Sequence, residues 1–359
     1  MEKRFEKSAG KKFLIRKFFL LPIALMTLGL LISCSEDEAP IENEVLPELP
    51  TTPYGIQGGN LLFEGQPTSL KGVNALQTFG LDNSNLMNEW KVDIVREFIG
   101  NLREQPVDGF AIQASDGAWY HPLQAIVDQH RANGRVTILC PFGWVDENGN
   151  QQLFTGLNPR QQDFYEAYST RMRAIAEHFA GQQDVWLEVW NEPYHWNNEN
   201  SYTHSRWLAD MQDMVDNLRS VQGFTNIIVV PGNEQGQSED VLIEEGQNLM
   251  EGRYNLLFDL HAYEKWLGDD NANTIVRRVN NLQEASLPFI FGEIGVVNVG
   301  DLMEVDTFLD VMDHQNIPTL AWLWNRNSED RNALLSDDGL PNDSNNLNWG
   351  STYQAFLKD

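Results

Sequence analysis

Two glutamates stand at the ends of strand-like apolar runs, where a fold can hold a side chain for chemistry. Glu192 comes two residues after the run Val185–Trp190 and precedes a proline, and Glu293 ends the run Pro288–Glu293. If one carboxyl stays protonated while the other is ionised, such a pair can cleave an acetal, with one as acid and the other as nucleophile. A lone strand-end glutamate more often pairs with a buried arginine, so this chemistry requires a fold that brings the two together.

Eight short runs could form the strands that position these residues. They are Ser69–Asn74, Val92–Ile99, Arg135–Phe142, Val185–Trp190, Asn226–Pro231, Leu256–Tyr263, Pro288–Glu293 and Pro318–Trp324. Several are apolar almost throughout, which is typical of strands buried on both faces of a parallel sheet. With helical patterns between them, the runs predict an α/β fold, a (β/α)8 TIM barrel in one domain. A doubly wound open sheet is the alternative, but no GxGxxG or GxxxxGK motif follows any run.

The segments around the runs predict further elements. Asn158–Ala180 has apolar residues at three- and four-residue spacing, with its first residue as the expected N-cap and a proline next. Trp207–Leu218 shows the same helical spacing. Gly58–Gln66 contains turn glycines between apolar residues and predicts a small hairpin before the barrel.

In a barrel of this kind, side chains at the C-terminal ends of the strands build the active site. Glu192 belongs to the fourth run and Glu293 to the seventh, so they would face each other across the barrel mouth. Arg96 lies among apolar residues in the second run, which argues against an ordinary surface arginine. His261 and Tyr263 are two residues apart in the sixth run, and both therefore point to the same side of that strand.

Six motifs, taken in order, resemble those of family 5 of the glycoside hydrolases, the cellulase and mannanase family of clan A. They are Lys71-Gly72-Val73-Asn74, Val95-Arg96, Trp190-Asn191-Glu192-Pro193, His261-Ala262-Tyr263, Phe291-Gly292-Glu293 and Ala321-Trp322. Only the Asn-Glu-Pro motif is distinctive alone, but the set in this order is specific. The resemblance extends over residues 54–359. It implies hydrolysis with retention of anomeric configuration, by double displacement through a glycosyl-enzyme intermediate.

The resemblance also implies a role for each matching residue. Glu192 is expected to be the general acid/base and Glu293 the nucleophile. Asn191 is expected to hold the sugar 2-hydroxyl. Arg96 would bond to Glu293 and keep it ionised, since a neighbouring cation favours the charged carboxylate.

Aromatic and imidazole side chains complete the expected site. The family places His261 and Tyr263 in it, with Tyr263 near the nucleophile, and a core histidine is the alternative for His261. Trp322 is expected to be the platform under the sugar at the cleavage point. Trp324 has the same strand parity and either extends that surface or belongs to the core. Four further tryptophans in expected loops could also contact sugar: Trp119, Trp144, Trp196 and Trp266.

The sequence leaves the substrate open. Ile138–Trp144 contains no histidine, although many family members carry one at the end of the third strand, so the subsite around the reacting sugar must differ. We expect an endo-β-1,4-glycanase, with β-mannan slightly favoured over β-glucan or cellulose. Ala321–Trp324 and Leu347–Gly350 resemble bacterial mannanases of the family, which gives that preference. The alternative is a non-catalytic surface glycan-binding lipoprotein, although a pure binder needs neither an acid nor a nucleophile.

Residues 1–33 resemble a lipoprotein signal peptide. A basic stretch precedes about fifteen apolar residues, too few for a comfortable membrane span. Leu31-Ile32-Ser33 before Cys34 resembles a lipobox, so Cys34 is expected to be lipidated and to anchor the chain to a membrane. An ordinary signal peptide with a chance cysteine and a membrane anchor helix are the alternatives.

The residues after Cys34 predict where the protein is delivered. Ser35–Glu38 is similar to the acidic tag of Bacteroidetes lipoproteins, which predicts an exported outer-membrane lipoprotein facing the cell surface. Residues 34–53 are rich in glutamate and proline and predict an extended acidic linker. Residues 54–359 would then form the barrel domain.

Charge and composition restrict the partners. The 359 residues carry a net charge of −27, and removal of residues 1–33, with a net charge of +5, would leave about −32. Such a field repels nucleic acid and suits a neutral polysaccharide. The two cysteines, Cys34 and Cys140, offer no disulfide framework. We expect a monomer.

Metal and cofactor sites are not expected. The seven histidines show no zinc-ligand spacing. The oxygen-rich segment Asp337–Asn346 lacks the regular spacing of a calcium loop, so a solvated turn is favoured there.

Overall fold

The computed structural model describes residues 53–80, 84–268, 271–325, 329–344 and 346–359. The expected signal peptide (residues 1–33), the lipidation site Cys34 and the linker, apart from Pro53, lie outside the described residues. None of the helices in the described ranges has the length and apolarity that crossing a bilayer requires.

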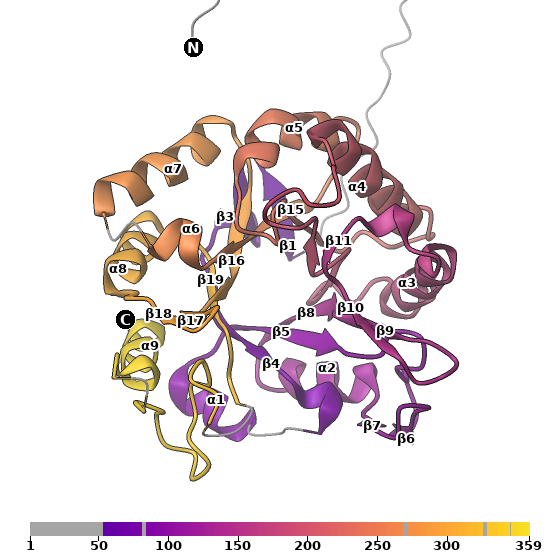
Figure 1. Cartoon of the computed structure of the whole chain (residues 1–359), viewed down its shortest axis with the longest axis horizontal. Helices are drawn as coiled ribbons and strands as arrows, with labels where there is room; N and C mark the ends of the chain where they lie inside the picture. The colour runs from indigo at the N-terminus through magenta and orange to yellow at the C-terminus, as the bar shows by residue number, and fades with distance from the viewer. Residues whose placement is uncertain (1–52, 81–83, 269–270, 326–328, 345) are drawn as a thin grey trace, which may run out of the picture. The chain divides into compact units, whose positions relative to one another are not determined.

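Eight parallel strands close into a barrel (Figure 1). In chain order they are β4 (Lys71–Ala75), β5 (Ile94–Ile99), β8 (Val136–Pro141), β12 (Val185–Glu188), β14 (Ile228–Pro231), β15 (Leu256–Ala262), β16 (Phe289–Ile294) and β19 (Thr319–Ala321). Each strand pairs with its neighbours in this order, and β19 pairs with β4 to close the ring. The predicted (β/α)8 barrel is confirmed, and each predicted run overlaps one strand, with β4 and β16 each ending one residue beyond the predicted run.

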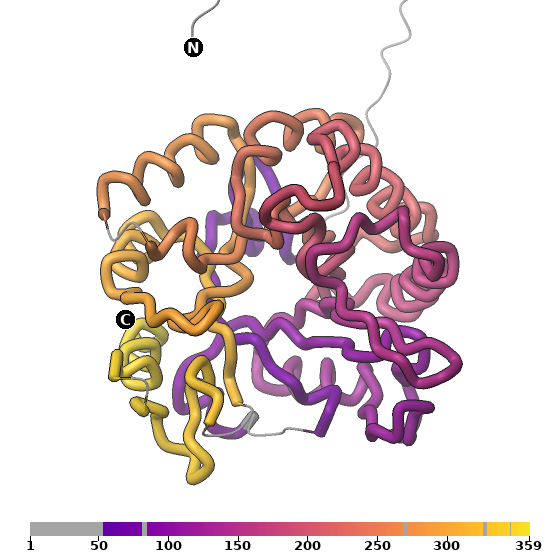
Figure 2. Tube along the Cα trace, in the orientation of Figure 1, coloured from indigo at the N-terminus to yellow at the C-terminus, as the bar shows by residue number. Residues whose placement is uncertain are grey.

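Helices follow the strands and surround the barrel (Figure 1). They are α1 (Ser84–Trp90), α2 (Leu123–Arg131), α3 (Tyr165–Phe179), α4 (His204–Arg219), α5 (Asp240–Met250), α6 (Glu264–Leu267), α7 (Ala272–Glu284), α8 (Asp306–Gln315) and α9 (Trp349–Lys358). The trace in Figure 2 shows the yellow C-terminal helix α9 beside the indigo helix α1, and the two are in contact. The last helix therefore completes the layer that the first helix begins.

The helix expected over Asn158–Ala180 is divided, which corrects the prediction. A 3-10 turn at Pro159–Gln161 precedes α3, and the Asn158 side chain makes no capping hydrogen bond. Phe164 lies in the break, and its ring stacks 5.4 Å from the ring of Trp144. Trp144 belongs to the hairpin of β9 (Gly143–Val145) and β10 (Gln151–Leu153), and a contact between such separate segments leaves no sign in the local spacing.

The predicted hairpin is present at the N-terminal end of the barrel. Strands β1 (Tyr54–Gln57), β2 (Asn60–Phe63) and β3 (Gln66–Pro67) form a small antiparallel sheet. The ring of Tyr54 lies 5.6 Å from that of Trp186, which is fully buried on β12. The hairpin thus covers the apolar floor of the barrel.

The barrel interior changes from apolar to ionic along its length. Ile94, Trp186 and Leu257 belong to one fully buried apolar cluster. Two residues further along the same strands, and therefore on the same side of each strand, are three charged side chains that are also fully buried. They are Arg96, Glu188 and Asp259. The C-terminal half of the interior is thus an ion-pair layer, directly beneath the ends of the strands.

Candidate active site

A cleft of about 280 Å³ opens above this ionic layer, at the C-terminal ends of the strands. Its lining comprises Phe142, Thr155, Asn191, Glu192, Gln235, Gln237, Tyr263, Glu293, Val297, Asn298, Trp322 and Asn332. A larger hollow of about 440 Å³ lies beside the N-terminal hairpin, but no ionisable side chain lines it. Of these two hollows, only the smaller cleft offers groups for acid–base chemistry, and both predicted carboxylates line it.

Arg96 connects the residues that the sequence placed in the site. Its Nη1 donates to Glu293 Oε1 at 2.7 Å, and its Nη2 donates to Asn191 Oδ1 at 2.9 Å. Nε and Nη2 also donate to the two oxygens of Glu188 at 2.6 and 2.8 Å, and Nη1 donates to Asn74 at 3.0 Å. These five bonds use all five N–H donors of the guanidinium. The expected bond from Arg96 to Glu293 is confirmed.

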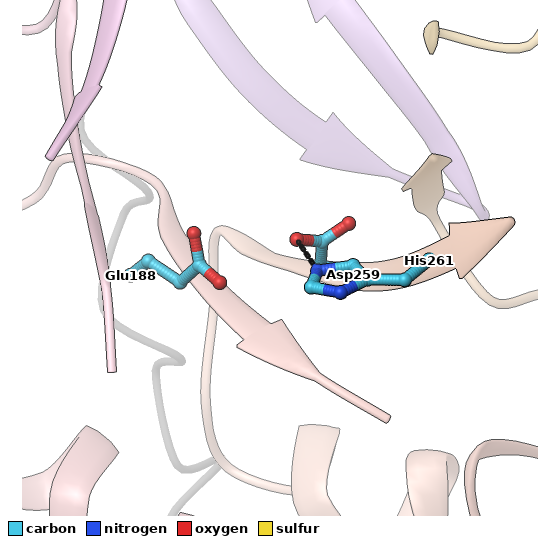
Figure 3. Close-up of side chains that lie close together, drawn as sticks. All are labelled: Glu188, Asp259 and His261. Atoms are coloured by element: carbon cyan, nitrogen blue, oxygen red, sulfur yellow. Dashed lines mark ion pairs between the residues drawn. The ribbon is translucent and has the colours of Figure 1, made fainter. Parts of the chain in front are cut away.

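His261 lies between the two expected catalytic carboxylates. Its Nδ1 is 2.9 Å from Glu192 Oε1 and 3.6 Å from Glu293 Oε2. On the other side of the ring, Nε2 is 3.4 Å from Asp259 Oδ2, and Figure 3 shows both side chains projecting from β15 toward each other. The structure thus places His261 in the site rather than in the apolar core.

The two expected catalytic carboxylates are close together. One oxygen of Glu192 and one of Glu293 lie within 4.8 Å of each other. The hydroxyl of Tyr263 donates to Glu293 Oε2 at 2.9 Å, so Arg96 and Tyr263 each hold one oxygen of this carboxylate. Burial and the charge of Glu293 raise the pKa of Tyr263 well above its ordinary value, which keeps it a donor.

Two acids of this cluster, Glu293 and Glu188, hold their protons more tightly than usual. Burial raises the pKa of Glu293, and the neighbouring Glu192 carboxylate raises it further, although His261 and Arg96 act in the opposite direction. Burial likewise raises the pKa of Glu188 to about 7 against the opposing effect of Arg96. We expected Arg96 to keep Glu293 ionised. The cation does oppose protonation, but it is shared with Glu188, so it only partly offsets burial.

The tryptophans divide between the cleft and the core. Trp322 lines the cleft and packs edge-on against Phe98 at 5.0 Å, as expected of a platform. Trp324 is 1% exposed and packs against Trp90, so it belongs to the core and does not extend that surface. Strand parity does not apply to it, because β19 ends at Ala321. Of the four loop candidates, Trp144 and Trp266 are buried, and Trp119 and Trp196 are exposed.

Among the residues that the structure describes, two groups of side chains have the atom types and spacing of metal ligands. Glu188 with Asp259 and His261 forms one, and Glu192 with His261 and Glu293 forms the other. Both oxygens of Glu188 accept hydrogen bonds from Arg96, so a divalent cation there would face the guanidinium at close range. The arrangement therefore fits an ion-pair network better than a metal site.

Sequence reasoning missed several residues of this network. Glu188 and Asp259 are charged side chains inside apolar runs, and that contrast was the signal that could have found them. The motif that contains Asn74 predicts no role for it, and its Nδ2 donates to the backbone oxygens of Gly292 and Ala321. Phe142, from the segment that lacks a histidine, lines the cleft.

Two smaller features have structural explanations. The Cys140 thiol is fully buried, and burial raises its pKa well above the ordinary value, so it is a poor nucleophile. In the segment 337–346, of which residue 345 lies outside the described ranges, the carboxylates of Asp338 and Asp343 accept hydrogen bonds from Ser336 and Ser351.

Comparison with known proteins gives one family. The sequence model described as Cellulase (glycosyl hydrolase family 5) matches residues 63–328. A mannan endo-1,4-beta-mannosidase of Cellvibrio japonicus (strain Ueda107) is 23% identical over 259 residues, which is 70% of this chain and 56% of that protein. Endoglucanase EG-II of Hypocrea jecorina is 25% identical over 276 residues, 72% of this chain and 56% of that protein. The chain thus spans just over half the length of these relatives.

Solved structures share the fold. The catalytic domain of a mannanase from Streptomyces sp. SirexAA-E superposes with a TM-score of 0.65 at 19% identity, covering 91% of this chain and 98% of that one. At this level of identity the likeness establishes a common barrel.

Arg96→Met tests the ion-pair layer. We expect a loss of about 3–5 kcal/mol in the free energy of unfolding near neutral pH, because buried carboxylates would lose their cation. Without Arg96 the pKa of Glu188 and of Glu293 would rise further above the unfolded values, so the loss should grow as pH rises and shrink toward about pH 5. Urea unfolding at several pH values measures this.

Arg131→Met is the matched control, because Arg131 makes an exposed ion pair with Asp184 at 2.6 Å. Its loss should stay below about 1 kcal/mol at every pH. Equal, pH-independent losses for the two variants would contradict the assignment of Arg96 as the central cation.

Proposed function

The chain belongs to glycosyl hydrolase family 5, and from that membership we propose that it hydrolyses internal β-1,4 bonds of a polysaccharide with retention of configuration. The observation that carries the proposal is the separation of the two carboxylates, whose nearest oxygens lie within 4.8 Å. Retaining enzymes place their carboxyl groups about 5–5.5 Å apart, and inverting enzymes about 6.5–9.5 Å apart to admit a water molecule. The short separation favours direct attack by Glu293.

In the first step, Glu192 gives its proton to the leaving glycosidic oxygen while Glu293 attacks the anomeric carbon. Arg96 and Tyr263 hold the two oxygens of Glu293, which orients the nucleophile. In the second step, Glu192 takes a proton from water, which attacks the same carbon and breaks the bond to Glu293. Asn191 lies beside Glu192 with its Oδ1 bound to Arg96, and its Nδ2 donates one N–H to Thr155 Oγ1 at 3.4 Å, which leaves the second N–H for the sugar 2-hydroxyl.

We favour β-mannan as the substrate, with β-glucan as the second candidate. A mannanase of Cellvibrio japonicus and a mannanase structure from Streptomyces are among the similar proteins, and an endoglucanase of Hypocrea jecorina is another. The amide-lined cleft suits neutral sugar hydroxyls: Asn298, Asn332, Gln235 and Gln237 all border it.

A substrate panel tests this proposal. Wild type should release reducing ends from mannan and glucomannan faster than from carboxymethylcellulose, mixed-linkage glucan, xyloglucan or xylan, and early products should be mixed oligosaccharides, as endo action requires. Glu192→Gln should lower kcat about 10²–10⁴-fold, because proton transfer to the leaving oxygen is lost. Glu293→Gln should lower kcat by at least the same factor. Oligosaccharide binding without cleavage by wild type would instead support the glycan-binding alternative.

Anomeric analysis tests the mechanism separately. Proton NMR of the first products should show the β-anomer before mutarotation. With an activated aryl glycoside, azide should rescue Glu192→Ala and form the β-glycosyl azide, since Glu293 still makes the covalent intermediate. Azide rescue of Glu293→Ala should give the α-glycosyl azide by single displacement. Initial release of the α-anomer by wild type would contradict the double displacement.

We also propose that the chain is exported and held at the outer membrane through a lipid on Cys34. The lipobox-like residues before Cys34 and the acidic residues after it support this proposal. In a Gram-negative host, the full chain should take up radiolabelled palmitate and sediment with outer membranes. Cys34→Ala should abolish both, whereas Cys140→Ala, which changes a buried thiol, should leave labelling intact. Equal labelling of the Cys34→Ala chain would refute the anchor.

A further inference from the structure

Asp259 is a fully buried carboxylate that does not line the cleft. It lies on β15, two residues before His261, and shares the barrel interior with Glu188 on β12 (Figure 3). The ion pair of Glu188 with Arg96 has an evident purpose, because it fixes the cation that holds Glu293. Asp259 has no such direct link to a catalytic oxygen, so its burial requires another explanation.

One oxygen of Asp259 is hydrogen-bonded, and the other lies at ion-pair distance from two nitrogens. Oδ1 accepts the backbone N–H of Gly292 at 2.6 Å. Oδ2 lies 3.4 Å from His261 Nε2 and 3.8 Å from Arg96 Nε. Within the described part of the chain, neither Asp259 Oδ2 nor His261 Nε2 makes a hydrogen bond, so the 3.4 Å ion-pair contact is what joins the two side chains. The Asp259 carboxylate is thus hydrogen-bonded to the backbone of β16 through one oxygen and faces the imidazole of His261 with the other.

Gly292 leaves the space that Asp259 occupies. A Cβ built on Gly292 would lie 2.2 and 2.3 Å from the two carboxylate oxygens, closer than any real contact. The residue immediately before the nucleophile therefore has to be glycine if Asp259 is to sit against its backbone. This close approach ties the position of Asp259 to the strand that carries Glu293.

We propose that Asp259 is a positioning residue that holds His261 as an imidazolium, with its Nδ1–H directed at the acid/base Glu192. The proposal rests on the hydrolytic function proposed above. If His261 were neutral with its proton on Nε2, its Nδ1 would accept a hydrogen bond from protonated Glu192. That hydrogen bond would direct the proton away from the leaving oxygen. A doubly protonated ring can only donate. It also favours the carboxylate that Glu192 becomes after the first step.

The charges around His261 agree with this role. The ionisable groups beside the ring are Asp259 on its own strand, Glu192, Glu293 and Glu188, and Arg96 and Tyr263 lie behind Glu293, to which both donate. Carboxylates outnumber cations in this set. Burial alone would lower the pKa of His261, but the carboxylates of Glu293, Asp259 and Glu192 together raise it well above the ordinary value.

Nitrogen NMR of the intact chain with ¹⁵N-labelled histidine tests the proposal without an activity assay. The His261 signals, identified by their loss in His261→Gln, should show two protonated nitrogens in wild type at pH values well above that at which an ordinary imidazole loses its proton. In Asp259→Asn they should titrate at least about one pH unit lower, since an opposite charge beside the ring is lost. A neutral His261 in wild type near pH 6 would overturn the proposal, whether or not the variant folds.

The pH dependence of kcat/KM gives the second readout. In Asp259→Asn a neutral His261 no longer favours ionised Glu192, so the alkaline limb should move to higher pH by about one unit and kcat should fall. Asp210→Asn is the matched control, because Asp210 is also buried and accepts a hydrogen bond from Tyr194 at 2.8 Å. Asp210→Asn should lower the free energy of unfolding and leave the alkaline limb of the kcat/KM profile at the same pH.

The two proposals fail separately. If wild type cleaves no β-glycan, the hydrolytic function is wrong, and the His261 signals still report its protonation. If wild type is active but Asp259→Asn keeps both the doubly protonated ring and the alkaline limb, the role of Asp259 is refuted and the function stands.

Discussion

The site depends on one buried cation. Arg96 is fully shielded from water and donates all five of its N–H groups, to Glu188, Glu293, Asn74 and Asn191. A charge so far from solvent is tolerated only when every donor finds a partner, so the guanidinium fixes the positions of its partners as much as they fix its own. It joins the ends of four barrel segments into one unit and presents Glu293 to the cleft in a defined orientation.

The same layer explains how two carboxylates can lie close together and still serve different roles. Glu188 holds Arg96, which contacts Glu293, and Asp259 lies against His261, which contacts Glu192. Glu293 and Glu192, the acids of the cleft, therefore each contact one cation. Each of these cations also contacts one carboxylate that is buried beneath the cleft. Burial raises the pKa of Glu188 and of Glu293, and the two cations only partly oppose this rise because four acids share them. The barrel makes this possible because parallel strands bring their C-terminal ends to one rim.

Because active-site residues of a barrel lie at the C-terminal ends of its strands, the sequence predicted residues that line the cleft. It did not predict the buried acidic residues beneath the cleft. Glu192, Glu293 and Tyr263 could be predicted because strand ends and motif order place them in the cleft. Asp259 was not predicted because it lies in the middle of β15, where its charge within an apolar run is its only distinguishing feature. Trp324 could not be assigned, since the parity of β19 stops at Ala321. The break before α3 depends on the stacking of Phe164 with Trp144, a contact that joins separate segments and leaves no local pattern.

The central claim is that Glu293 becomes covalently bonded to the sugar while Glu192 supplies and recovers the proton. A substrate with fluorine at C2 and a good leaving group slows the second step more than the first, so the intermediate should accumulate. Mass spectrometry of digested protein should then find the glycosyl adduct on the peptide that contains Glu293, and Glu293→Gln should carry none. An adduct on a different residue, or the same adduct in Glu293→Gln, would contradict this account.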